Sequence, residues 1–227
     1  MKELQKQIIQ VLAERFAPYG FVKRSGNCFT RDISKNVWQR MEFPSSYYHP
    51  GVKAIYPRIA VGYKDEFNLE RKYFDLHWPF PNYTYNTFYT MLLNIVRTDD
   101  LCWRFRKEED IIPQIDDMTQ AIVEKAIPYM DYISDRKNLI AEMESGFIYS
   151  KMESWCYRGL PIAYYLEGRK DLALWRLNYY IQKFEKELSG HMKEDENSNF
   201  TRGTRNELQA YLEFAEKLKK VMETESR

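Results

Sequence analysis

Two glycines enclose a Lys-Arg pair near the start of the chain, and glycine-rich basic loops can bind phosphate. The segment runs Gly20-Phe21-Val22-Lys23-Arg24-Ser25-Gly26-Asn27, with five residues between its glycines. A Walker-type loop has four, followed by Gly-Lys-Ser or Gly-Lys-Thr and a helix N-terminus. The residues that follow here are strand-like, and Ser25-Gly26-Asn27 is typical of a turn because Gly and Asn tolerate positive φ. We therefore predict a turn leading into a sheet.

The cysteines and histidines form no recognisable catalytic or metal-binding pattern. They are spread along the chain as Cys28, Cys102, Cys156, His49, His77 and His191. No C-x-x-C or paired-His spacing occurs, so we predict no metal, no disulfide framework and no cofactor. A hydrolase or transferase stays one alternative, with a site assembled from the distant residues Asp75, His77 and Cys28.

Charge is balanced overall but unevenly distributed. Thirty-four Lys and Arg against 33 Asp and Glu give +1, which argues against a general coating of nucleic acid or membrane. Residues 1–64 carry +7 and residues 65–145 carry −7. These two parts either pair with each other or leave a basic face exposed, and the exposed face predicts a nucleic-acid binder as a second alternative.

Period-two alternation predicts an antiparallel sheet of three to four strands. Apolar and polar residues alternate over 37–43, 55–63 and 71–78, with turn residues between these segments. On each strand the alternate side chains share a face. One face of this sheet is then aromatic and basic, and its candidate binding residues are Trp38, Arg40, Tyr56, Arg58, Arg71, Tyr73 and His77. Such a face suits a protein partner, nucleic-acid bases or a cover of C-terminal helices.

Helical patterns precede and follow the predicted sheet. Leu4, Ile8, Leu12 and Phe16 predict an N-terminal helix over 3–17. Further helices are expected at 86–97 and 108–130, the second interrupted near Pro113 and ended at Pro128. A helical hairpin from 146 to Gly190 and a last helix opening at Thr204 complete the chain. The sequence therefore predicts an α+β protein with an α+β domain at 1–145 and a helical part at 146–227.

Parts of the chain resemble two known families. The stretch from Gly20 to Arg31, preceded by a helix, and the stretch from Asp110 to Met130 resemble a family of uncharacterised bacterial domains, over roughly residues 1–145. That family has a helix, a Gly-Phe-basic turn, a Phe-x-Arg strand and closing helices, and it implies no catalytic residues. Residues 159–188 are similar to a single tetratricopeptide repeat.

These patterns predict a non-enzymatic bacterial protein that binds another protein, of an accessory or immunity-like kind. The first residues lack the apolar core of a signal peptide, and no apolar run approaches the ~20 residues of a membrane span. We therefore expect a cytoplasmic protein with no membrane partner. With 16% aromatic residues, exposed rings leave a homo-oligomer open as well.

Overall fold

The computed structural model describes residues 2–49, 51–74, 82–96, 101–145, 153–194 and 198–224. The chain divides into two compact units, each described here by itself. The first unit comprises Met1–Lys64 and Trp78–Glu142, and the second comprises Asp65–His77 and Met143–Arg227. The predicted α+β class is confirmed, with an N-terminal helix, antiparallel sheets and a helical C-terminal half.

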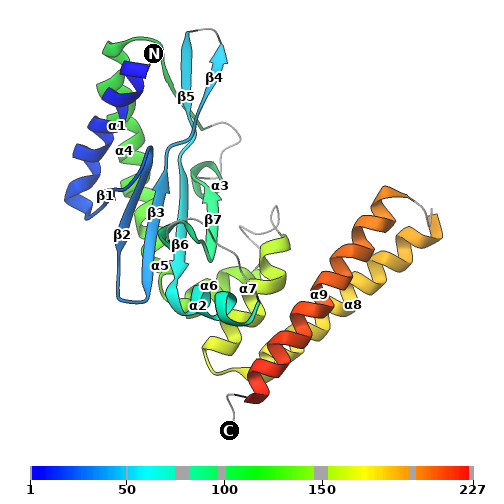
Figure 1. Ribbon diagram of the computed structural model, residues 1–227. Helices are drawn as coiled ribbons and strands as arrows, with labels where there is room; N and C mark the ends of the chain where they lie inside the picture. Colours follow the sequence, from blue (N-terminus) through cyan, green and yellow to red (C-terminus); the bar gives the residue numbers. More distant parts are fainter. Residues whose placement is uncertain are drawn as a thin grey trace. The chain divides into compact units, whose positions relative to one another are not determined.

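The first unit contains two antiparallel sheets and the helices that pack on them (Figure 1). Its strands are β1 (Val22–Lys23), β2 (Cys28–Asp32), β3 (Val37–Glu42), β4 (Ser45–His49), β5 (Val52–Ile55), β6 (Arg58–Tyr63), β7 (Phe88–Met91) and β8 (Trp103–Phe105). The larger sheet has the order β1-β2-β3-β6-β7, and the smaller one has the order β4-β5-β8. Alternation over 37–43 and 55–63 thus correctly predicted β3 and β6, the two central strands.

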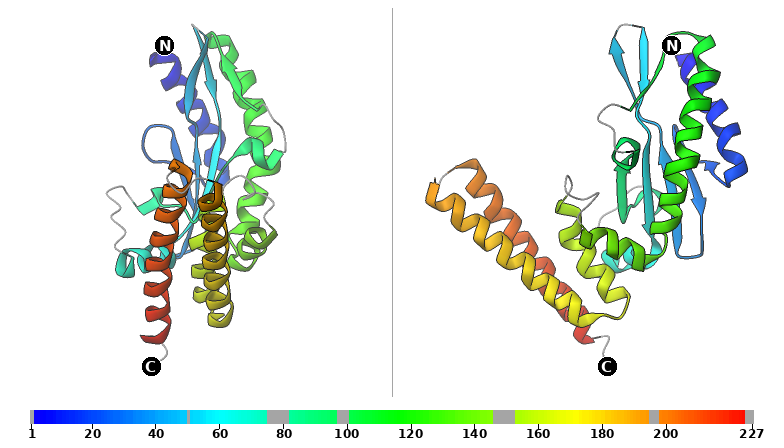
Figure 2. Two further views of the ribbon diagram at one scale, coloured as in Figure 1. Left: turned by 90° about the vertical axis from the view of Figure 1, so that its right-hand side faces the viewer. Right: turned by 180° about the vertical axis from the view of Figure 1, so that it is seen from behind.

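The first unit also contains helices, several of which pack on its strands. They are α1 (Lys2–Phe16), α3 (Leu92–Val96), α4 (Ile111–Ala121), α5 (Ile127–Ile133) and α6 (Arg136–Ser145), the last of which continues into the second unit. Figure 1 and the rear view in Figure 2 show α1 and α4 side by side along the sheet. Aromatic rings fill the layer between α1 and the sheet. Phe16 of α1 stacks on Phe43 at 5.7 Å, and Phe29 of β2 meets both rings edge-on.

The second unit is built from helices. They are α2 (Lys64–Tyr73), α7 (Glu153–Leu166), α8 (Lys170–Glu194) and α9 (Asn199–Thr224). The turn between α7 and α8 uses Gly168, whose φ of 74° lies in the left-handed region that glycine adopts without strain. Buried rings from α8 and α9 form much of the core, among them Tyr180, Phe184, Tyr211 and Phe214.

Two predicted elements were wrong in type. Residues 71–73, predicted as the start of a strand, form the end of helix α2, because Asp65 and Glu66 in its first turn and Arg71 and Lys72 in its last complement the helix dipole. The remainder of that predicted strand lies outside the described residues. Residues 88–91 form β7 rather than helix, since pairing with β6 satisfies their backbone groups.

Three predicted helix boundaries also differ. Helical structure continues past Pro128 to Ile133, and a π-helix at Ile122–Ala126 precedes this proline, whose missing N–H would otherwise break the ladder. Helix α8 passes Gly190 and ends at Glu194. Helix α9 begins at Asn199 rather than near Thr204, because the Thr201 N–H donates to Ser198 Oγ at 3.0 Å and caps the first turn.

Candidate functional site

The larger sheet has a helix-covered face and a polar face, and the register assigns residues to each. Residues paired across strands share a face. Thr30 pairs with Arg40, Arg40 with Ala60, and Glu42 with Arg58. We call this side the polar face; it comprises Thr30, Trp38, Arg40, Glu42, Arg58 and Tyr89. The opposite side, which includes Phe29, Gln39, Met41 and Phe88, packs on α1, α4 and α5 and is the helix-covered face.

Three of the seven predicted binding residues lie together on the polar face. Trp38 and Arg40 on β3 and Arg58 on β6 are neighbours there. Trp38 is 8% exposed and Arg40 is 4% exposed, so these two are core residues rather than part of an open recognition surface. Strand β3 therefore does not present the flat, exposed aromatic and basic surface that the alternation predicted.

The other four predicted residues do not join this face. Tyr56 lies between β5 and β6, where its backbone N–H donates to Pro44 O at 3.1 Å. Arg71 and Tyr73 are on α2, in the second unit, because that segment is helical. His77 lies outside the described residues.

Ion pairs and hydrogen bonds link the polar side chains to one another. Arg40 Nη2 lies 3.3 Å from Glu42 Oε1, and Arg40 Nη1 donates to the Tyr83 carbonyl at 3.4 Å. Arg58 Nη1 donates to the Tyr89 hydroxyl at 2.7 Å. Burial raises the pKa of Tyr89 above its ordinary value, although the nearby Arg58 opposes this change. The Tyr89 hydroxyl is therefore neutral across the physiological range.

Several donors on the polar face have no acceptor. Among the described residues, Arg40 Nε, Arg58 Nε and Trp38 Nε1 are buried without a hydrogen-bond partner. Leaving such a donor unsatisfied costs about 1–3 kcal/mol. All three atoms are closed to solvent, so a group outside the fold cannot reach them without a rearrangement of these side chains.

Cys28 begins β2 at the edge of this face, opposite Glu42. Burial raises the pKa of its thiol to about 11, outweighing the opposing effect of Arg40. At neutral pH the thiol is protonated, so Cys28 does not supply a thiolate nucleophile. Its suggested partners Asp75 and His77 lie outside the described residues. No cluster of three potential metal ligands occurs within the described ranges.

Part of the basic N-terminal segment pairs with the acidic segment that follows it. Arg15 Nε lies 2.7 Å from Asp116 Oδ1, and Arg31 Nη2 lies 2.5 Å from Asp131 Oδ1. Both contacts are within the first unit. They reduce the cationic surface that a nucleic-acid backbone could contact along residues 1–64.

A second group of candidate residues lies on α8 and was missed from the sequence. The rings of Trp175 and Tyr179 stack with centroids 5.8 Å apart, and the Arg176 guanidinium lies 5.1 Å and 5.3 Å from them. Trp175 is 55% exposed and Tyr179 is 45% exposed. We call Trp175, Arg176 and Tyr179 the α8 aromatic surface. Its sequence signal is a Trp and a Tyr four residues apart, off the buried stripe of Leu177 and Phe184.

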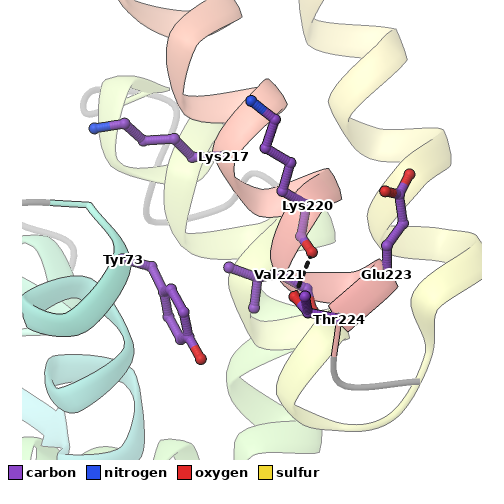
Figure 3. Close-up of a pocket in the computed structure, with 6 residues that line it drawn as sticks. All are labelled: Tyr73, Lys217, Lys220, Val221, Glu223 and Thr224. Atoms are coloured by element: carbon purple, nitrogen blue, oxygen red, sulfur yellow. Dashed lines mark hydrogen bonds between the residues drawn. The ribbon is translucent and has the colours of Figure 1, made fainter. Parts of the chain in front are cut away.

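The second unit also has a pocket of about 500 Å³ between α2 and α9, and Tyr73 helps to line it (Figure 3). Lys217, Lys220 and Val221 of α9 line it as well. Lys220 Nζ lies 2.6 Å from Glu216 Oε1. One of the two lysine ammonium groups that line the pocket therefore already has a carboxylate partner. The Thr224 hydroxyl donates to the Lys220 carbonyl at 2.6 Å and closes the last turn of the helix. This pocket therefore offers few unsatisfied groups.

Comparisons with known proteins add no further assignment. No protein-family model, curated protein or solved structure matches this chain. None of the described helices has the length and apolar character needed to cross a membrane. Function must therefore be argued from the residues.

Proposed function

We propose that the protein is a non-enzymatic binding protein whose partner is another protein, and that the α8 aromatic surface is the contact. The observation that carries this proposal is the exposure of a stacked Trp–Tyr pair around an arginine. Trp, Tyr and Arg are the residues most enriched at the energetic centres of protein interfaces. From the sequence we predicted a contact surface on the sheet. The surface that we propose instead lies on helix α8.

Local order favours binding by this surface. Arg176 is held against three rings, since its guanidinium also lies 5.5 Å from that of Tyr180. Tyr180 is itself buried and packs against Tyr211 of α9. A side chain fixed before binding loses little conformational entropy when the partner arrives. The side chains of the α8 aromatic surface are therefore largely ordered before a partner binds.

The energetic gain from covering this surface is substantial. The exposed half of two rings of roughly 200 Å² each amounts to about 200 Å². At ~25 cal/mol/Å², removing that area from water contributes about 5 kcal/mol. Arg176 is only partly buried, so a carboxylate on the partner can add a charge-assisted contact with its guanidinium. The partner that fits carries apolar side chains beside a carboxylate.

The test compares partner capture by the tagged full chain with capture by Trp175→Ser/Tyr179→Ser. The matched control is Ile112→Ser/Tyr132→Ser, which alters two residues of similar exposure, 49% and 45%, in the first unit. Captured proteins are quantified by mass spectrometry at low and at high salt. We expect a stoichiometric protein that the wild type and the control retain and that the α8 variant loses at least tenfold.

Two outcomes would overturn the proposal. Retention of the same partner by the α8 variant would show that the surface is not the contact. Recovery of nucleic acid alone, released by salt, would favour the nucleic-acid alternative instead. Arg176→Gln separates the contributions, since it should make binding weaker and less salt-sensitive while the rings still contact the partner.

A further inference from the structure

The outward side of α8 carries a row of exposed residues whose spacing is the same in both directions along the helix. Helix α8 packs on α7 and α9 (Figure 2), and Ala173, Leu177 and Phe184 on its inward side are buried. The opposite side carries six exposed residues, which we call the α8 outward row: Asp171, Trp175, Asn178, Tyr179, Gln182 and Lys186. Successive members lie 4, 3, 1, 3 and 4 positions apart, so the row is symmetric about the midpoint between Asn178 and Tyr179.

A symmetric row is complementary to a second copy of itself. In a two-fold symmetric contact the same surface patch meets itself, so an antiparallel pair of α8 helices places each position opposite its mirror position in the row. Asp171 of each copy then lies opposite Lys186 of the other, so the pair has opposite charges at both ends. A parallel pair would instead place like charges opposite each other, which is unfavourable. The charges of the row therefore favour the antiparallel arrangement, in which Trp175 meets Gln182 and Tyr179 meets Asn178.

The charges at the two ends of the row are available for such a contact. Asp171 and Lys186 are both exposed, and neither forms an ion pair with another residue in the described part of the chain. By contrast, Lys183 on the flank of the same helix lies 4.0 Å from Glu187. The carboxylate and the ammonium group at the ends of the row can therefore each pair with a second copy without giving up an ion pair within their own chain.

We propose that two copies of the chain pair antiparallel through the α8 outward row, and that this pairing regulates partner binding. The inference rests on the proposed function, because the dimer buries Trp175 and Tyr179, the rings that the partner contacts. The row covers about four turns of helix, or roughly 22 Å. A contact of that length on one helix per copy buries less than the ~1,200 Å² of a stable interface. The dimer is therefore weak and reversible, and a tighter partner displaces the second copy.

Analytical ultracentrifugation of the full chain over a wide range of concentrations measures the dissociation constant of the dimer with no partner present. Lys186→Glu places two carboxylates opposite each other at both ends of the row, so it should raise this constant at least fivefold. Asp171→Lys should raise it similarly. The double variant Asp171→Lys/Lys186→Glu restores opposite charges and should return the constant to near the wild-type value. Glu207→Lys, at an exposed position on α9, is the matched control and should leave it unchanged.

Partner capture separates this inference from the proposed function. Lys186→Glu keeps both rings, so it should capture more partner than the wild type at concentrations where the wild type is dimeric. Equal or lower capture would overturn the regulatory role. A wild type that stays monomeric at every concentration, or a double variant that does not restore pairing, would overturn the dimer and leave the proposed function standing. A dimer that follows the expected charge pattern in a chain that captures no protein would support the pairing and overturn the proposed function.

Discussion

Both faces of the larger sheet are buried, but they differ in how fully their polar side chains are hydrogen-bonded. On the helix-covered face, Gln39 Nε2 donates to Asp131 Oδ1 at 2.9 Å and to Ser134 Oγ at 3.0 Å, and its Oε1 accepts from Arg31. On the polar face, donors of Trp38 and Arg40 lack partners among the described residues. The helices that cover one face also supply its hydrogen-bond partners. The two faces therefore differ in how far neighbouring elements satisfy their polar side chains.

Neighbouring residues on β2 give the largest expected contrast between the faces. Phe29→Ala removes a buried ring that contacts Phe16 and Phe43 on the helix-covered face, and should lower the free energy of unfolding by about 3–5 kcal/mol. Thr30→Val removes the hydroxyl that accepts from Arg24 Nε at 2.8 Å, and should cost about 1 kcal/mol. Urea unfolding measures both. Equal costs would show that the two faces contribute alike.

The adjacent pair on β3 tests hydrogen-bond satisfaction with an effect of intermediate size. Gln39→Met removes hydrogen bonds to Asp131, which is exposed, and to Ser134, which is half-buried, so we expect a loss of about 1 kcal/mol. Arg40→Met leaves Glu42 and the Tyr83 carbonyl without the guanidinium that they contact, and should cost about 3 kcal/mol. Thermal and urea unfolding distinguish the two variants. A larger loss for Gln39→Met than for Arg40→Met would contradict this ranking of the two residues.

The last contrast is the pH dependence contributed by Cys28 on the polar face. Its pKa is raised from 9.0 to about 11 by burial, so the folded state keeps a proton that the unfolded state releases. Stability should therefore fall as the pH rises from 9 to 11, and Cys28→Ala should remove this part of the decrease. Unfolding curves at several alkaline pH values measure the slope. An identical slope in both proteins would mean that Cys28 titrates normally.

Local patterns predicted the parts of the fold that follow local rules. Period-two alternation located β3 and β6, and the Gly26 turn, with a φ of 54°, is where Ser25-Gly26-Asn27 placed it. The alternation at 71–73 was misleading because helix-favouring charges over 64–72 outweigh it. Strand β7 and the continuation past Pro128 depend on pairing and packing with distant residues, which no short window contains.

The candidate sites were predicted only in part, for a related reason. Strand alternation brings Trp38, Arg40 and Arg58 to one face, and the register confirms their common side. Their burial could not be predicted, because it depends on what covers the sheet. Trp175 and Tyr179 were missed because exposure, and not residue type, separates them from the buried rings of Tyr180 and Phe184 on the same helix.

The close approach of Trp38 to Gly62 has a consequence for how this sequence can diverge. Since any side chain at position 62 would overlap the indole, the two positions form one steric unit. Substitution at either site should be accepted only together with a compensating change at the other, so that a larger residue at 62 accompanies a smaller one at 38. In an aligned set of relatives, these two positions, 24 apart in the chain and paired across the sheet, should covary.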